Sequence, residues 1–372
     1  MSHNRIKPTF RIRRTWLGAL AAALLLAFAA TPARAQIAIK TEDATFKFGF
    51  EGQLWADWTQ DSTAGEQGYQ QNFYLRRARL IMSGDIGDDI SFFFETDSPN
   101  LGKTPKTPGA GIIVQDAFLE WKPMQVLQID GGLFLVPFSR NTLQSTLSYY
   151  TIDISSLTTV NNTATQSAGL RDLGFQARGF FLEDHLLYRV GAFQGERDAN
   201  ARDSLRTAGY LQYDFFDTET GYVFAGTALG KKKILAIDVG GDKQGTYRSL
   251  SANTALDLPV NKGDEIGGQF QYFHYDGREK FTSIADQNDW FVESAYYIHR
   301  AKLQPFAKFE SQSFVKNVLD TSDIHRVGSG VNLYVRGQSL KWTLQYNRLY
   351  PQNGSPLKDS NEFTMQLQLF YF

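Results

Sequence analysis

Hydrophobic and polar side chains alternate along residues 46–58, which read FKFGFEGQLWADW. Phe46, Phe48 and Phe50 share one parity, while Lys47 and Glu51 lie on the other. Because successive residues of a strand point to opposite faces, the pattern predicts a β-strand with one apolar and one polar face. Either a sandwich core or a lipid bilayer could cover the apolar face.

The same alternation recurs along most of the chain. Segments of period two bounded by Gly, Asn, Asp or Pro predict sixteen strands, at 45–59, 70–84, 89–97, 111–122, 126–135, 172–181, 185–195, 205–216, 232–243, 247–258, 264–275, 289–299, 301–311, 323–336, 339–350 and 361–372. The segment 217–231 could hold a further strand. An even number of strands is what a closed antiparallel barrel of the bacterial outer membrane requires.

The links between these strands alternate in length. Short ones, such as GDIGDD at 84–89 and KPMQ at 122–125, interleave with longer polar ones, such as 98–110. Short turns at one rim and long loops at the other are typical of outer-membrane barrels. Two links break the rule, because 217–231 is long on the short-turn side and 244–246 is short on the loop side.

A soluble β-sandwich of two or three domains would need linkers, and the sequence has no segment that reads as one. A soluble barrel of sixteen strands would have an interior too wide for side chains to fill. In a membrane the apolar face meets lipid, the polar face meets water, and closure pairs every backbone amide. The sequence therefore predicts an all-β, 16-stranded antiparallel transmembrane β-barrel over residues 36–372.

Residues 1–35 predict a cleaved secretory signal peptide, because a basic head precedes the apolar run WLGALAAALLLAFAA and the small-residue site TPARA. That run is shorter than the roughly 20 residues that a membrane-spanning helix needs. Removing the 35 residues leaves 337 of the 372, with 32 basic and 39 acidic side chains. The chain has no cysteine, which excludes disulfides, thiol catalysis and Cys-ligated metals.

The longest link, 136–170, follows the fifth predicted strand and is too polar to form a core of its own. We expect this third outer loop to fold into the barrel and narrow it, with Ser139, Tyr149 and Tyr150 at the constriction; a flexible external loop is the alternative. The chain ends on Phe372, a terminal aromatic of the kind that the barrel-insertion machinery reads. Phe372 lies on the opposite parity to Phe363, Met365, Leu367 and Leu369.

Four blocks resemble the phosphate-selective porin O/P family. They read NFYLRRARLIMSGDI (72–86), QDAFLEWKP (115–123), GGLFLVPFSRNTLQS (131–145) and GKKKILAIDVGGD (230–242). The resemblance runs, with gaps, over nearly all of residues 45–372. It implies a trimeric sixteen-stranded porin in the outer membrane, with an inward loop and lumenal Arg and Lys side chains that conduct anions such as phosphate or polyphosphate. Leu135 is a departure, since members often carry Lys at that position.

Arg76, Arg77 and Arg79 match a motif of that family. Alternation places Arg77 and Arg79 in the lumen and Arg76 near the wet outer rim. Guanidinium groups suit phosphate because they pair bidentately and stay charged; the alternative is that these two arginines are ionic partners of Glu51 or Glu95. The other arginines predicted to line the pore or bind anions are Arg140, Arg178, Arg326 and Arg336.

By parity the lumen holds ten basic and twelve acidic side chains, so positive charge does not dominate it. A general or cation-preferring diffusion porin without phosphate specificity therefore stays open, as does a structural or adhesive barrel. None of the five histidines has a serine and an orienting partner at strand spacing, which argues against an enzyme. We expect no cofactor, metal or nucleic acid, and as partners outer-membrane lipid, small inorganic anions, the insertion machinery and a homotrimer.

Overall fold

The computed structural model describes residues 37–61, 68–103, 111–315, 322–352 and 357–372, so the predicted signal peptide lies outside the described residues. Almost all regular structure is β. The strands are β1 (Ile37–Lys40), β2 (Ala44–Gln60), β3 (Tyr69–Ile86), β4 (Ile90–Asp97), β5 (Ile113–Met124), β6 (Leu127–Leu135), β7 (Arg171–Phe181), β8 (Leu186–Phe193), β9 (Arg206–Asp214), β10 (Ile234–Gln244), β11 (Tyr247–Val260), β12 (Asp264–Asp276), β13 (Gln287–Tyr297), β14 (Leu303–Phe314), β15 (Ile324–Gln338), β16 (Leu340–Pro351) and β17 (Ser360–Tyr371).

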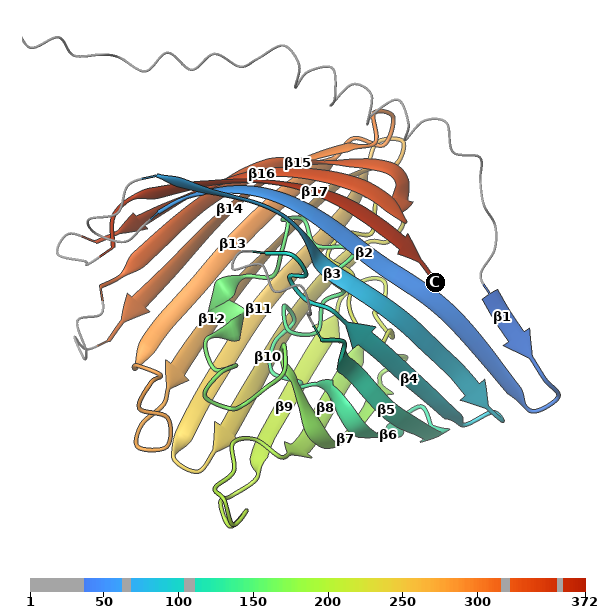
Figure 1. Cartoon of the computed structure of the whole chain (residues 1–372). Helices are drawn as coiled ribbons and strands as arrows, with labels where there is room; N and C mark the ends of the chain where they lie inside the picture. Colours follow the sequence, from blue (N-terminus) through green and yellow to red (C-terminus); the bar gives the residue numbers. More distant parts are fainter. Residues whose placement is uncertain (1–36, 62–67, 104–110, 316–321, 353–356) are drawn as a thin grey trace, which may run out of the picture. The chain divides into compact units, whose positions relative to one another are not determined.

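Within the described residues, the sixteen strands β2 to β17 form a closed antiparallel barrel (Figure 1). Each strand pairs with its neighbours in sequence, and β17 closes the ring on β2 from Glu362 opposite Thr59 to Tyr371 opposite Phe50. The short β1 pairs with β2 at Thr45 to Phe48, on the edge that β17 leaves free. The prediction of a closed 16-stranded antiparallel barrel is confirmed, with β1 as a short addition.

The segment between β9 and β10 forms no strand, although all its residues are described. It makes one parallel bridge, between Gln144 and Phe224. Two backbone hydrogen bonds hold the bridge, from Ser145 N to the Phe224 oxygen at 2.8 Å and from Phe224 N to the Leu143 oxygen at 2.8 Å. The long link on the short-turn side therefore contacts the 136–170 segment instead of extending the sheet.

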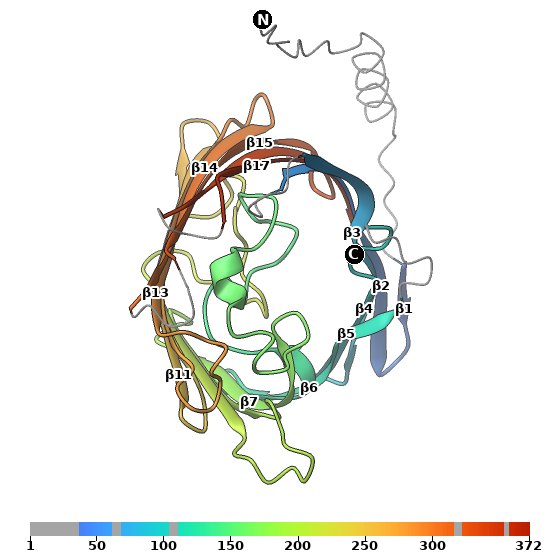
Figure 2. The same ribbon diagram turned by 60° about the vertical axis from the view of Figure 1, so that its left-hand side comes forward.

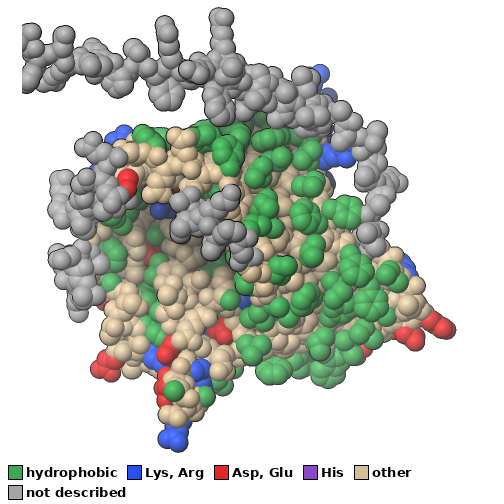
Figure 3. Space-filling model, in the orientation of Figure 1, with side chains coloured by type: hydrophobic (Ala, Val, Ile, Leu, Met, Phe, Trp, Pro, Cys, Tyr) green, Lys and Arg blue, Asp and Glu red, His purple; other side chains and the backbone are tan. Residues whose placement is uncertain are grey.

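The two faces of the barrel carry opposite chemistry. Phe175, Leu80 and Leu119 are 71%, 62% and 61% exposed on the outside, whereas Gln53 and Gln368 are buried within. Figure 3 shows hydrophobic side chains gathered over the outer face of β2 and its neighbours. No helix among the described residues is long and apolar enough to cross a membrane. The distribution is the reverse of a water-soluble protein and matches lipid outside with water inside.

Residues 136–170 lie within the ring of strands, where they carry the 3-10 turn η1 (Ser156–Thr159) (Figure 2). The segment bonds to the inner wall at several points. Asn141 N donates to the Gln271 side chain at 3.3 Å, and the Ser155 hydroxyl donates to Glu310 at 2.5 Å. The Tyr150 hydroxyl donates to Asp257. These contacts attach the segment to β11, β12 and β14.

Candidate functional site

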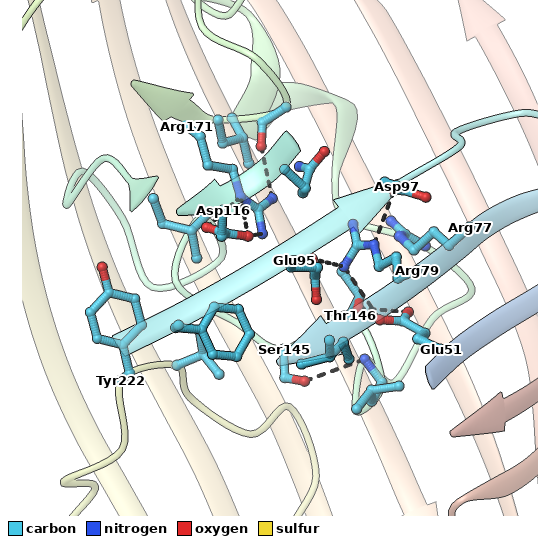
Figure 4. Close-up of a pocket in the computed structure, with 18 of the residues that line it drawn as sticks. Glu51, Arg77, Arg79, Glu95, Asp97, Asp116, Ser145, Thr146, Arg171 and Tyr222 are labelled. Atoms are coloured by element: carbon cyan, nitrogen blue, oxygen red, sulfur yellow. Dashed lines mark hydrogen bonds and ion pairs between the residues drawn. The ribbon is translucent and has the colours of Figure 1, made fainter. Parts of the chain in front are cut away.

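A cavity of about 710 Å³ lies between the wall formed by β2 to β5 and the 136–170 segment. Figure 4 shows charged side chains around Arg79 at one end and Tyr222 at the other. The charged side chains lining the cavity are Lys47, Arg76, Arg77, Arg79 and Arg171, with Glu51, Asp85, Glu95, Asp97, Asp116 and Glu120. Its volume suits a small solute.

A β-bulge places two adjacent arginines on the same side of β3. Gln53 pairs with Arg77 and Leu54 with Leu75, so Arg76 is the extra residue. An extra residue shifts the alternation, and both guanidinium groups therefore reach Asp153, each at 2.7 Å. Simple parity puts Arg76 on the face opposite Arg77, and it fails here because it does not hold across a bulge. The expected position of Arg76 near the outer rim stays a prediction.

Asp153 belongs to the 136–170 segment and fixes it to β3. Burial by itself would raise the pKa of Asp153, but the guanidinium groups of Arg77 and Arg76 outweigh burial and hold that pKa well below its usual range. The carboxylate is thus ionised at neutral pH. It neutralises one of the two positive charges that the bulge brings into the lumen.

Arg79 contacts three carboxylates on the neighbouring strands. Its side-chain nitrogens lie 3.3 Å from Glu51, 3.1 Å from Glu95 and 3.0 Å from Asp97. Glu51 is its direct cross-strand partner in β2. Arg79 is thus an ionic partner of both Glu51 and Glu95, which was the alternative to anion binding. Arg77 instead contacts Asp153 and the Gln53 side chain.

Arg171 was missing from the predicted set. It is the first residue of β7, and its guanidinium pairs with Asp116 on β5, with a shortest contact of 2.9 Å. A bulge at Gln115 on β5, between the pairs Glu95–Asp116 and Thr96–Val114, turns Gln115 and Asp116 both inward. The only feature of the sequence that could have pointed to Arg171 is its place as a basic residue directly after the 136–170 segment.

The other predicted arginines do not line this cavity. Arg178 pairs with Glu120, and Arg326 pairs with Glu310 at 2.9 Å. Arg140 makes a bidentate pair with Glu219, at 2.6 and 2.9 Å, and so joins the 136–170 segment to the link between β9 and β10. Arg336 is exposed near the end of β15. The structure thus brings Arg76, Arg77 and Arg79 together at the cavity. The other four predicted arginines lie outside its lining.

The three residues predicted at the constriction are all buried. Tyr149 lines the cavity, and burial raises the pKa of Tyr149 to about 12, so its hydroxyl stays protonated. Tyr150 contacts the far wall at Asp257, and the Ser139 hydroxyl lies 2.9 Å from that of Thr142. Of the three, only Tyr149 faces the open space.

The charged groups of the cavity differ in how far solvent reaches them. Side chains of Glu51, Glu95, Asp97, Asp116 and Glu120 are 3% to 6% exposed. Those of Arg76 and Arg171 are 23% and 12% exposed. Asp153 is 20% exposed but lies against Arg76 and Arg77. Arg77 and Arg79 are 5% and 6% exposed, and Asp85, which also lines the cavity, is exposed. A solute therefore meets guanidinium more readily than carboxylate only around Arg76 and Arg171.

No group of three or more His, Asp or Glu side chains among the described residues could hold a metal ion. The chemistry that these side chains offer is ion pairing and hydrogen bonding to a passing solute. Permanently charged guanidinium groups suit weak, reversible contacts with anions.

Comparison with known proteins agrees with the fold. A family model described as phosphate-selective porin O and P matches residues 48–233. No curated protein matches the chain. Among solved structures, an anion-selective porin from Comamonas acidovorans has a TM-score of 0.61 and 11% identity, over 88% of this chain and 100% of that one. OmpF of Salmonella typhi, in complex with daunomycin, has a TM-score of 0.59 and 13% identity, over 90% and 100%. A trimer form of OmpT from Vibrio cholerae has a TM-score of 0.51 and 14% identity, over 89% and 100%. At such identities the likeness shows the fold alone.

Proposed function

This chain belongs to the phosphate-selective porin O and P family, and we propose that its channel passes small anions through the cavity beside Arg76, Arg77, Arg79 and Arg171. Membership makes it an outer-membrane porin, a channel protein and not an enzyme. Its polar lumen and apolar exterior suit passive diffusion of hydrophilic solutes across the outer membrane.

The observation that carries the anion preference is that two of the arginines, Arg76 and Arg171, are more exposed than five of the six carboxylates that line the cavity. The lining has five basic and six acidic side chains, so net charge gives no preference for anions. Five of those acids lie at 6% exposure or less, whereas Arg76 is 23% and Arg171 is 12% exposed. Arg77 and Arg79 are as buried as these acids, and the sixth acid, Asp85, is exposed but lies next to the last residue of β3. Because nearby charge acts most strongly on a permeating ion, we expect a modest preference for anions.

The 136–170 segment is proposed to be the constriction of the channel. Its bonds to Asp257, Gln271 and Glu310 attach it to one wall, and the Asp153 contacts attach it to β3 on the other. The Arg140–Glu219 pair adds a third anchor from the link between β9 and β10. A segment anchored on three sides would hold the size of the opening fixed.

A second candidate is a general diffusion porin without phosphate specificity. The observation that favours it is that Arg76, Arg77, Arg79 and Arg171 each already contact a carboxylate. A phosphate group would have to compete with those ion pairs for the guanidinium donors. Phosphate itself is an expectation from the family and not from these contacts.

The test is a measurement on single channels of the mature porin in planar bilayers. Under a KCl gradient we expect open channels with a reversal potential that indicates a modest preference for chloride. A cation-selective reversal potential would eliminate the anion-porin proposal while leaving the barrel intact. Addition of phosphate then separates the two candidates, since block of the chloride current supports phosphate binding and its absence supports the general porin.

We also propose a homotrimer, on the family expectation and on the trimer form of OmpT. Cross-linking in detergent at low protein concentration tests it.

Recognition of Phe372 by the insertion machinery is a further proposal. Its ring contacts that of Phe93 edge-on, with centroids 6.5 Å apart. Loss of membrane insertion on removal of Phe372 would support that role.

A further inference from the structure

The end of the cavity away from Arg79 is built from aromatic rings. Phe93 on β4 and Phe118 on β5 are direct cross-strand partners that both line the cavity, with centroids 5.7 Å apart and planes at 29°. Tyr222, from the link between β9 and β10, stacks on Phe118 at 4.6 Å and 22°. Phe372 meets Phe93 edge-on. The lumen of a porin is normally polar, so this apolar surface is out of place.

The aromatic pair and the charged groups occupy successive positions on the same two strands. Phe93 and Phe118 form one rung of the β4–β5 ladder, and Glu95 and Asp116, two residues along each strand, form the next on that face. Two residues at ~3.3 Å each place the rungs about 7 Å apart. At the charged rung, Arg171 contacts Asp116. A benzene ring with an attached carboxylate spans that distance.

We propose that the cavity binds small aromatic carboxylates, with the ring against Phe93 and Phe118 and the carboxylate directed to Arg171. The inference rests on the proposed anion-porin function and names a solute class for the same cavity. The carboxylate is favoured over an amine because Asp116 is 5% exposed and Arg171 is 12% exposed. Ring stacking adds affinity that a simple anion cannot obtain.

A structural role for the rings is the competing explanation. Tyr222 and Phe372 could use Phe93 and Phe118 only as anchors for the link and the chain end. In that case an aromatic carboxylate would interact with the channel no better than an aliphatic one of the same charge.

The experiment measures block of the KCl current through the mature porin in planar bilayers at pH 7 by benzoate, acetate and benzylammonium. We expect benzoate to block at a lower concentration than the other two. Phe93→Leu keeps an apolar side chain and should raise the half-blocking concentration of benzoate roughly fivefold. The matched control is Phe94→Leu, one residue along β4 on the opposite face, which should leave the block unchanged. Phe118→Leu is a second test, and heat-modified gel migration checks that each variant folds.

Equal block by benzoate and acetate, or equal benzoate block in wild type and Phe93→Leu, would overturn the aromatic site while leaving a conducting porin. Block by benzylammonium as strong as that by benzoate would overturn the assignment to carboxylates. Absence of any KCl conductance would reject the porin function, and this proposal with it.

Discussion

The carboxylate of Asp153 offers a direct test of how charge in the cavity sets ion preference. It lies 2.7 Å from both Arg76 and Arg77 and cancels part of their charge. Asp153→Asn keeps the shape and an oxygen acceptor but removes one negative charge. The two guanidinium groups that the β3 bulge turns inward would then face the lumen with less compensation.

The size of the effect follows from the geometry. One unit charge about 6 Å from an ion in water changes its energy by roughly 0.7 kcal/mol, about threefold in occupancy. Screening at ~0.1 M salt, with a Debye length of about 10 Å, lowers this to about twofold. Because anions and cations respond in opposite directions, the chloride-to-potassium permeability ratio should rise about fourfold.

The assay is the reversal potential of wild type and Asp153→Asn under the same KCl gradient. The matched control is Asp88→Asn, which removes the same charge at the exposed turn between β3 and β4 and should change the ratio little. Gel migration before and after heating checks that the variant barrel remains folded. An unchanged ratio, or a shift towards potassium, would refute the view that the guanidinium groups near Asp153 set the ion preference.

Other predictions concern the same contacts. Changing both Arg77 and Arg79 to Ala should shift the reversal potential towards cations, and an unchanged permeability ratio would show that both are structural. Glu219→Gln leaves the buried guanidinium of Arg140 without its ionic partner, so open-channel noise should increase and the unfolding temperature should fall; a recording as quiet as wild type would contradict an anchoring role. The folded-state pKa of Asp153 lies below its usual value, so its stabilisation is present above the unfolded pKa and lost only as pH falls through the lower folded value. The selectivity difference between wild type and Asp153→Asn should therefore persist from pH 7 down to about pH 4, and its loss by pH 5 would contradict the lowered pKa. The mature chain should need detergent to stay in solution, and a compact globule in plain buffer would overturn the barrel in lipid.

The alternation of side chains was enough to place the strands. The predicted strand 126–135 is β6 (Leu127–Leu135), and 264–275 is β12 (Asp264–Asp276). The sequence of each strand shows which of its faces is apolar and which is polar, because neighbouring residues point to opposite faces. This alternation does not depend on the rest of the chain. The number of strands, the closed antiparallel order and the polar lumen follow from that local rule and from the need of lipid for paired amides.

The cavity depends on contacts that no local pattern encodes. The bulge at Arg76 appears only in the pairing of β2 with β3, and it reverses the face that parity assigns. Asp153 meets Arg76 and Arg77 across more than 70 residues of sequence. The link between β9 and β10 has no periodicity, and its contacts with Arg140 and Phe118 exist only once the barrel has closed.

The sequence by itself thus determined which faces of the strands meet lipid and which meet water. Only the tertiary structure decided which charges remain accessible, since that depends on how two inward segments pack against the wall. The geometry of a single strand decides which side chains point to each face. The ion pairs depend instead on charged groups from distant parts of the chain, which are buried together only when the barrel closes.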